Sequence, residues 1–531
     1  MSFHQDFLSQ IIANFTNFTI VGCYFTSLNH PLTVTLYSNK IKIVFMKRRI
    51  TMLLISAITI GSFSAQDGKV ANELPKGAIV KNVEKPTFLA EFPTTYWTDN
   101  ADVSWYNAID TNFEISTSAE LAGLAKLVKG GNKMIGKNFK LMQNIDIQAH
   151  LWDPIGFNNT NPFSGNFDGN NKTISNLQIN REGGDWLGLF GQFITATVKD
   201  LTLDGSKIYG KDTSGGFIGN MAVNSTATNC HVKNVDLVFT SYNVGGFTGG
   251  VLTGSTVDNC SSKGSVVGVN QIGGFAGTSW SNSMIKNSYC EGTVEGQYIV
   301  GGFSGFVTFA FGPPTVNKIQ DSYSRSNVSA SSDTVGGFYG WAQTTGDFKN
   351  VYSTGTVTVV TDTGGFVGKV GNLTVANAHF DSTIAPIDGV GGFQGAPVTL
   401  DITGHATADM KTEAFNTIMN QGLTTGVWSI NPLINDGYPY LNTQPLLAAN
   451  SVKSNSVNVT VVPTNVDSSL KIITPETNVS YEIFEMSGKV SRKGNLSGAQ
   501  KELNVSSLSK GIYIINVKTE KGNKSIKFIK K

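Results

Sequence analysis

A glycine-rich motif, Gly-Gly-Phe-x-Gly, recurs through the middle of the chain and constrains its fold more than any other feature. A variant at residues 188–191 (Gly-Leu-Phe-Gly), in which Phe190 is the aromatic residue, opens the series. The phenylalanines of the full motif are Phe217, Phe247, Phe275, Phe303, Phe338, Phe366 and Phe393. Most of them follow one another at intervals of about 28 residues. Repeats of roughly 20–50 residues are typical of solenoids, propellers and arrays.

The content of each repeat selects among these architectures. The unit has no stretch of helical periodicity, and it consists of short alternating runs rich in Val, Thr, Ser and Tyr that Gly and Asn interrupt. A propeller blade needs about 40 residues or more, so this unit is too short for one. We therefore predict an all-β chain in which residues 113–445 form a parallel β-helix. Its coils of about 28 residues would stack at the strand spacing of about 4.8 Å.

Positions within the repeat predict which side chains face inward. The motif phenylalanine is constant while the next residue varies from Ile218 to Gln394, as expected when neighbouring positions face opposite sides of a strand. We expect the phenylalanines to stack as an internal ladder. The second half of each unit aligns on a turn-forming residue, at Asn229, Asn259, Asn287, Asp321, Asn350 and Asn377. These side chains predict a second ladder, at a turn.

The cysteines follow the same repeat. Cys23 precedes the predicted secretion signal, whereas Cys230, Cys260 and Cys290 are spaced by 30 residues. Cys230 and Cys260 directly follow ladder asparagines, which places them inward on adjacent coils. Two interpretations stay open: stacked free thiols that fill the core, or a Cys230–Cys260 disulfide, because neighbouring strands lie within bridging distance.

The candidate binding site lies on the opposite face of the same strands. Two residues after each ladder position the sequence has His231, Ser261, Tyr289, Tyr323, Tyr352 and His379. Arg325 and Glu291 flank the tyrosines, and exposed aromatic rings with polar neighbours suit sugar rings or a protein partner. The candidate ligand-binding residues are therefore Tyr289, Tyr323, Tyr352 and Arg325. The alternative is that the tyrosines form a structural ladder.

Both ends of the predicted solenoid have segments suited to closing it. Thr117 and Glu120 have capping-box spacing and precede an apolar helical face, which predicts an N-terminal capping helix. A short amphipathic stretch, 414–419, leads to Trp428 and to 437–441, and we expect this part to close the C-terminal end.

The N-terminal part contains a secretory signal pattern. A basic run begins at Met46, an apolar run covers 50–60, and small residues follow at 61–66. We predict a signal peptide at 46–65, an upstream stretch 1–45 absent from the mature protein, and an entry segment at 66–112. The alternative is an N-terminal extension with an internal anchor. We expect no transmembrane segment in the mature chain.

Composition and motifs disfavour several functions. The chain has 40 Lys+Arg against 38 Asp+Glu, a balance that does not favour nucleic acid as a partner. It lacks zinc-protease, nucleophile-elbow and phosphate-loop motifs and has six histidines, so we expect no metal site and no cofactor. Four residues after each ladder position the charges are mixed, at Lys233, Lys263, Glu291, Arg325 and Asp381. Without a matched carboxylate pair, we predict a non-enzymatic protein; a polysaccharide lyase or hydrolase is the alternative.

With these residues assembled, residues 102–445 resemble bacterial surface proteins that carry the GLUG motif. The resemblance includes 115–117 (Ile-Ser-Thr), 121–125 (Leu-Ala-Gly-Leu-Ala) and 163–170 (Phe-Ser-Gly-Asn-Phe-Asp-Gly-Asn). It implies a surface or adhesin-like role, with glycan or a host or matrix protein as the ligand. Some members are attached to peptidases, but the family carries no agreed catalytic residues.

Residues 451–531 resemble the type A C-terminal sorting domain of the type IX secretion system, within a predicted β-sandwich at 446–531. The matching parts are 481–489, 508–513 and the basic end 524–531. The chain has Pro463-Thr464-Asn465 where the family usually has Pro-Asn-Pro. The resemblance implies the type IX machinery as a partner, and a protein secreted to the outer surface of a Gram-negative bacterium.

Overall fold

The structure is a computed structural model that describes short strands between residues 25 and 41 and most of residues 83–531. Within 83–531 the description omits 309–315, 344–345, 372–373, 396–398, 424–425, 445–458, 463–464, 486–489, 499–500 and 520–521. The predicted signal peptide at 46–65, residues 66–82 of the entry segment and Cys23 lie outside the described residues.

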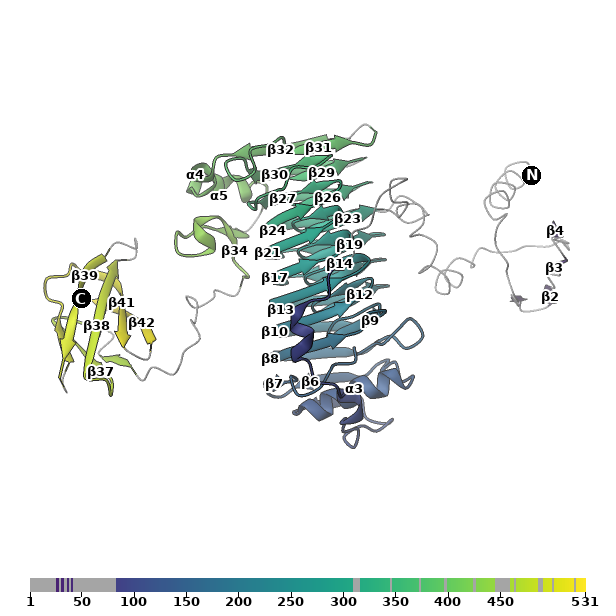
Figure 1. Ribbon diagram of the computed structural model, residues 1–531, viewed down its shortest axis with the longest axis horizontal. Helices are drawn as coiled ribbons and strands as arrows, with labels where there is room; N and C mark the ends of the chain where they lie inside the picture. The colour runs from purple at the N-terminus through teal and green to yellow at the C-terminus, as the bar shows by residue number, and fades with distance from the viewer. Residues whose placement is uncertain are drawn as a thin grey trace. The chain divides into compact units, whose positions relative to one another are not determined.

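Residues 1–79 and 80–531 form separate units. In the first unit, β1 (Phe25–Ser27) pairs antiparallel with β2 (His30–Leu32), and β3 (Leu36–Tyr37) with β4 (Lys40–Ile41). The predicted parallel β-solenoid lies in the second unit, where it has about nine turns (Figure 1). Among the described residues its strands form parallel sheets of fourteen, eight and six strands.

The strands of each sheet come from successive coils. The fourteen-strand sheet contains β5 (Asn112–Ile115), β6 (Asn138–Leu141), β7 (Ile145–Asp146), β8 (Asn166–Asn180), β10 (Thr197–Gly210), β13 (Thr226–Phe239), β16 (Thr256–Asp258), β17 (Ser261–Val267), β20 (Met284–Lys286), β21 (Tyr289–Gly296), β24 (Asn317–Ala330), β27 (Gly346–Ser353), β30 (Thr374–Asp381) and β32 (Thr399–His405). The eight-strand sheet contains β9 (Phe190–Ile194), β12 (Ile218–Ala222), β15 (Thr248–Val251), β19 (Ala276–Trp280), β23 (Ser304–Thr308), β26 (Tyr339–Ala342), β29 (Val367–Val370) and β31 (Val390–Phe393). The six-strand sheet contains β11 (Ser214–Gly215), β14 (Tyr242–Gly245), β18 (Asn270–Gly273), β22 (Tyr298–Gly301), β25 (Val335–Gly336) and β28 (Thr363–Gly364).

The motif phenylalanines form the predicted internal ladder. The six rings from Phe217 to Phe366 are fully buried. Their centroids lie 4.7–5.2 Å apart, and their planes are within 17° of parallel. The spacing matches the distance between neighbouring strands, so each ring stacks on the ring of the next coil. This confirms the inward orientation that the repeat predicted.

The two ends of the phenylalanine ladder differ from the prediction. Ile218 pairs with Phe190, so Leu189 occupies the first ladder position, although Phe190 is also buried. At the other end Val367 pairs with Val390, which places Gly389 at the ladder position. Phe393 is 59% exposed and is not part of the ladder. In the last coil the residue at the ladder position comes four residues before the motif phenylalanine. The prediction from motif spacing therefore placed the Phe393 ring wrongly.

The asparagine ladder is also present, and it begins one coil earlier than predicted, at Asp200. The seven ladder residues all have a left-handed backbone, with φ between 47° and 55°. Asparagine and aspartate tolerate this conformation better than other residues with a side chain. The side-chain amides also bond between coils, as from Asn350 Nδ2 to Asp321 Oδ1 (2.9 Å) and from Asn377 Nδ2 to Asn350 Oδ1 (2.9 Å). The ladder therefore fixes both the turn and the stacking register.

The motif glycines allow close approach between coils. A Cβ atom built on Gly246 would lie 2.2 Å from the carbonyl oxygen of Gly274 on the next coil. A side chain at this position would push the coils apart. Steric exclusion therefore explains why the repeat retains glycine before its phenylalanine.

The N-terminal end of the solenoid has the predicted cap. Helix α3 (Ser118–Lys129) begins at a full capping box, in which the Thr117 hydroxyl accepts from the Glu120 amide and the Glu120 carboxylate accepts from the Thr117 amide. Its apolar face, with Leu121, Leu124 and Val128, is buried. The preceding residues contain the short 3₁₀ helices η1 (Thr87–Glu91) and η2 (Trp97–Asp99).

The C-terminal segment, defined here as residues 407–444, does not close the end of the solenoid as predicted. It contains α4 (Thr407–Met410), α5 (Glu413–Met419), β33 (Trp428–Ser429), η3 (Asn435–Gly437) and β34 (Tyr440–Leu441). These elements pack against the outer face of the fourteen-strand sheet, where α4 and α5 lie beside β27, β30 and β32 (Figure 1). The final strand, β32, keeps four of its seven residues exposed. The amphipathic residues of α5 therefore cover a side of the solenoid.

The last part of the chain forms a small, mostly antiparallel two-sheet domain. A three-strand sheet contains β35 (Thr460–Val462), β37 (Ser469–Ile473) and β40 (Lys501–Asn504). A five-strand sheet contains β36 (Asn465–Val466), β38 (Asn478–Glu485), β39 (Val490–Ser497), β41 (Gly511–Thr519) and β42 (Gly522–Lys530). A separate hydrophobic core, with Leu470, Ile483 and Phe528, holds the sheets together.

The phenylalanine ladder gives a direct test of the fold. Phe275→Ala should lower the free energy of unfolding by about 3–5 kcal/mol, because it leaves a cavity between two stacked rings. Phe393→Ala should change it by less than about 0.5 kcal/mol, because this ring is exposed. Denaturant unfolding followed by circular dichroism measures both values. Equal effects of the two substitutions would contradict the ladder.

Candidate functional site

The three candidate tyrosines form a stacked row on the outer face of the fourteen-strand sheet. Tyr289, Tyr323 and Tyr352 occupy paired positions in β21, β24 and β27. Their ring centroids are 4.9 and 5.0 Å apart, and the ring planes lie within 10° of parallel. The sequence therefore located the row and its spacing correctly. Parallel strands in register bring the same position of each coil together.

The exposure expected for this row is wrong for two of its members. Tyr323 and Tyr352 are fully buried, and Tyr289 is half-buried. The C-terminal segment covers them with a second hydrophobic cluster, in which Met410, Phe415, Met419, Trp428, Tyr438 and Leu441 are buried. The repeat alone could not reveal this cover, because it comes from residues outside the repeats. In this structure the tyrosine row joins the solenoid to the segment that covers it.

Each buried hydroxyl in the row has a partner in the C-terminal segment. The Tyr323 hydroxyl donates to Gln444 Oε1 (2.8 Å), and the Tyr352 hydroxyl donates to the carbonyl oxygen of Pro439 (2.5 Å). Burial raises the pKa of Tyr289 to about 12 and raises the pKa values of Tyr323 and Tyr352 as well. The phenols therefore stay protonated at physiological pH and act as donors.

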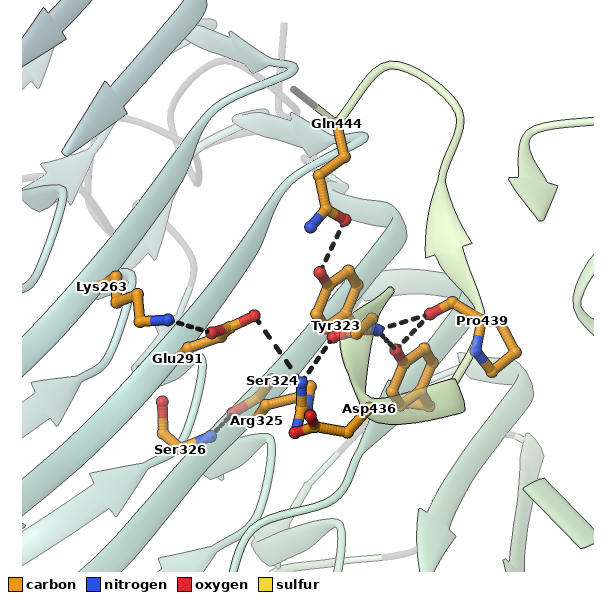
Figure 2. A network of polar contacts seen from close by, with 11 residues as sticks. Lys263, Glu291, Tyr323, Ser324, Arg325, Ser326, Asp436, Pro439 and Gln444 are labelled. Carbon is orange, nitrogen blue, oxygen red and sulfur yellow. Dashed lines mark hydrogen bonds and ion pairs between the residues drawn. The ribbon is translucent and has the colours of Figure 1, made fainter. Parts of the chain in front are cut away.

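Arg325 belongs to an ion-pair network that also reaches the C-terminal segment (Figure 2). Its guanidinium contacts Asp436 and lies 3.9 Å from Glu291, which is 3.0 Å from Lys263. Burial disfavours the charge of Arg325, but the hydrogen bond with Asp436 and the nearby charges, that of Glu291 foremost, together outweigh it, and the pKa of Arg325 is raised. The same hydrogen bond lowers the pKa of Asp436. Three of the mixed charges predicted from the sequence, Lys263, Glu291 and Arg325, thus form one network, and Arg325 links it to the C-terminal segment.

The three described cysteines are free and fully buried. Cys230 and Cys260 lie inward on adjacent coils as free thiols, the arrangement expected for the interpretation in which they fill the core. Each of the two thiols contacts a backbone carbonyl oxygen of its own coil, at 3.3 Å. Burial raises the pKa of Cys290 to about 12 and places that of Cys260 well above its usual value.

A second row of aromatic residues, on the eight-strand sheet, was missed by the sequence reasoning. Phe306 pairs with Trp341, and Trp341 pairs with Lys369, at the position three residues after each motif phenylalanine. Trp280 lies on the preceding coil, two residues after Thr278, which is the residue that pairs with Phe306. Trp280 and Trp341 are half-buried, whereas Phe306 is buried between neighbouring coils. Reading the third position after each motif phenylalanine would have found Phe306, Trp341 and Lys369.

The polar groups of this row suit it to a ligand. Lys369 lies over the Trp341 ring, with its ammonium 5.7 Å from the ring centroid, and pairs with Asp362 at 2.7 Å. Within the part of the chain that the structure describes, the indole nitrogen atoms of Trp280 and Trp341 are buried and have no hydrogen-bond partner. A buried donor without a partner costs about 1–3 kcal/mol, which an acceptor on a ligand that reaches it would recover.

Two family models match the chain. The C-terminal match, residues 460–531, is to the secretion system C-terminal sorting domain, and the match in the solenoid, residues 240–267, is to the GLUG motif. The chain thus carries a GLUG-type β-solenoid followed by a type IX sorting domain. The sorting domain indicates a secreted or cell-surface protein that uses the type IX machinery. No helix among the described residues has the length and apolar character needed to cross a membrane.

Short stretches of the chain are similar to two curated proteins. One stretch of 83 residues is 39% identical to part of halomucin from Haloquadratum walsbyi. This stretch makes up 15% of this chain and 1% of halomucin. A stretch of 80 residues is 40% identical to part of a protein from Evansella cellulosilytica that is named as a Gly-rich membrane protein. This stretch makes up 14% of this chain and 9% of that protein. The chain therefore matches only a small fraction of each relative's length.

The buried thiols give a second testable prediction. The sulfur atoms of Cys230, Cys260 and Cys290 are all buried, and burial also raises the pKa values of Cys260 and Cys290. The three thiols should therefore resist iodoacetamide at pH 8 in the folded protein. All three should react once guanidinium unfolds the chain without a reductant. Mass spectrometry counts the alkylated sites. A Cys230–Cys260 pair that reacts only after reduction would show that a disulfide forms after all.

Proposed function

We propose that this protein is a non-enzymatic, adhesin-like binding protein of the bacterial surface, and that its ligand is a glycan. The binding surface is the aromatic row of the eight-strand sheet, formed by Trp280, Phe306, Trp341 and Lys369. The observation that carries the proposal is the pair of half-buried indole rings whose N–H groups are buried without a partner.

The chemistry of the row favours a sugar. The flat apolar face of a pyranose ring stacks on an indole, and the hydroxyl groups at the sugar's edge accept hydrogen bonds from the indole N–H. Lys369 and Asp362 add a donor and an acceptor beside Trp341. Strand pairing holds the row on adjacent coils, so little conformational entropy is lost on binding.

The charged groups of the fourteen-strand sheet support a function without catalysis. Glu291 lies between Lys263 and Arg325, and the buried Asp381 accepts hydrogen bonds from Tyr438 and Thr407. A polysaccharide lyase or hydrolase needs an acid or base that can reach its substrate. Here these carboxylates are engaged in holding the C-terminal segment.

A glycan array on the purified chain tests the proposal. We expect binding that the double substitution Trp280→Ala and Trp341→Ala weakens roughly ten- to a hundredfold, as the loss of two aromatic contacts implies. The matched control is Phe393→Ala, which removes an exposed ring from the last strand of the same sheet and should keep the affinity. Circular dichroism must show both variants folded.

Two results would contradict this function. Unchanged glycan affinity in the double variant would exclude the aromatic row as the binding surface. Release of reducing ends from any bound polysaccharide would show that the protein is an enzyme.

The sorting domain gives a separate prediction. A chain without residues 460–531 should stay in the periplasm, because the type IX machinery reads this domain. Immunoblots of periplasm, cell surface and medium measure the distribution. As a control, residues 460–531 fused to an unrelated protein with a signal peptide should carry that protein to the surface or the medium. Surface delivery of the truncated chain would refute the assignment.

A further inference from the structure

We propose that the C-terminal segment is an acid-sensitive cover, and that a pair of neutral histidines, His379 and His405, latches its α4–α5 end over the tyrosine row. Protonation of this pair would release α4 and α5 and uncover Tyr352. The proposal is independent of the glycan site on the eight-strand sheet.

His379 continues the tyrosine row toward the end of the solenoid, and His405 lies beside it. His379 in β30 pairs with Tyr352 in β27. On β32 the partner of His379 is Thr403, and His405 is the last residue of that strand, two residues further on. His405 Nε2 lies 3.0 Å from His379 Nδ1, and His379 Nε2 lies 2.8 Å from Asn377 Oδ1. His379 is 5% exposed.

Burial and the hydrogen bonds together favour a neutral His379. The side-chain nitrogen of Asn377 donates to Asn350 Oδ1 and to the carbonyl oxygen of Ile418, so Asn377 Oδ1 is free to accept from His379 Nε2–H. In the neutral form His379 Nδ1 accepts from His405 Nε2–H. A proton on His379 Nδ1 would place a positive charge at a buried site against the Phe415 ring, and His405 Nε2 would have to change from donor to acceptor.

The same residues hold α5. Both imidazole rings meet the Phe415 ring edge-on, with centroids 5.1 Å from it. Asn377, the last rung of the asparagine ladder, donates to the Ile418 carbonyl oxygen at 2.9 Å. Phe415 in turn lies edge-on to Tyr352, with centroids 6.5 Å apart. Disruption of the histidine pair therefore loosens the contacts that keep α5 over Tyr352.

The charged groups around the pair do not remove its sensitivity. Asp401 on β32 accepts a hydrogen bond from the backbone N–H of Asn377, and Asp409 lies on α4. Asp381 on β30 accepts hydrogen bonds from the hydroxyl groups of Tyr438 and Thr407. Burial lowers the pKa of His379 to about 4, with a further contribution from His405, and burial lowers the pKa of His405 despite Asp409. The released state, with the ordinary histidine pKa of about 6.5, binds protons more readily. The closed state is thus fully favoured above about pH 6.5 and loses stability as the pH falls toward 4.

The other end of the cover should stay attached in acid. The Arg325–Asp436 pair holds η3, and this contact lowers the pKa of Asp436, so its carboxylate keeps its charge at pH 5. For His379 alone, pKa values of 6.5 in the open state and about 4 in the closed state allow the closed-to-open ratio to fall by about 300-fold at most. About 60-fold of this change develops between pH 7 and pH 4.5. Release should therefore begin at α4 and α5.

Hydrogen exchange with mass spectrometry on the full chain tests the latch. Between pH 7 and pH 4.5, and after correction for intrinsic exchange rates, peptides covering 407–419 should lose protection. Peptides covering 435–441 and the phenylalanine ladder should keep theirs. His379→Gln should abolish the acid effect, because glutamine can make both hydrogen bonds without taking a proton. If that variant fails to fold, His405→Gln provides a partial test. Its amide can still donate to His379 Nδ1, so the acid effect should become smaller but persist, because His379 still takes up a proton.

The matched control is His231→Gln. His231 is also buried, with its pKa lowered to about 4, but it lies on β13 and bonds to Ser261 and Asn229, away from the cover. This variant should release 407–419 in acid as the unmodified chain does. The proposal is overturned if 407–419 stays protected at pH 4.5, if His379→Gln retains the acid effect, or if the ladder peptides lose protection together with 407–419.

Discussion

The fold depends on the register with which each coil stacks on the next. Parallel pairing places equivalent residues of successive coils one strand spacing apart, so every position of the repeat becomes a row along the solenoid. The left-handed asparagine ladder and the buried phenylalanine ladder fix that register from two sides of the coil. A substitution in either ladder therefore acts on two neighbours at once. The outer rows inherit their spacing from this register, including the stacked tyrosines and the aromatic row of the eight-strand sheet.

The repeat made most of the solenoid predictable. Its constant phenylalanine, its turn asparagine and the small residue after that asparagine are governed by local geometry, so one sequence period specifies their orientation. The capping box of α3 is also local and was predicted correctly. The errors occur where the period ends. Leu189 and Gly389 occupy the first and last ladder positions. Leu189 keeps the spacing of about 28 residues but has no aromatic ring, whereas the last coil is shorter than the middle ones.

The cover over the tyrosine row could not be predicted from the repeat, because it is a long-range contact between repeated and unrepeated sequence. The amphipathic pattern of α5 indicated an apolar surface to bury but not which surface would receive it. The row itself explains why it is covered, because fully exposed stacked rings would leave a large apolar patch in water. Arg325, Tyr323 and Tyr352 each have a polar partner in the segment, so the cover satisfies the row's hydrogen bonds as well.

One aromatic row is covered by the protein itself, whereas the two indole rings of the other row are partly exposed. Hydroxyl-radical footprinting of the full chain at pH 7.5, read residue by residue by mass spectrometry, measures this difference directly. The account predicts rapid oxidation of Trp280, Trp341 and Phe393, with Tyr323, Tyr352 and Trp428 protected until the chain unfolds. Oxidation of Tyr323 and Tyr352 as fast as that of Trp341 in the folded protein would contradict it.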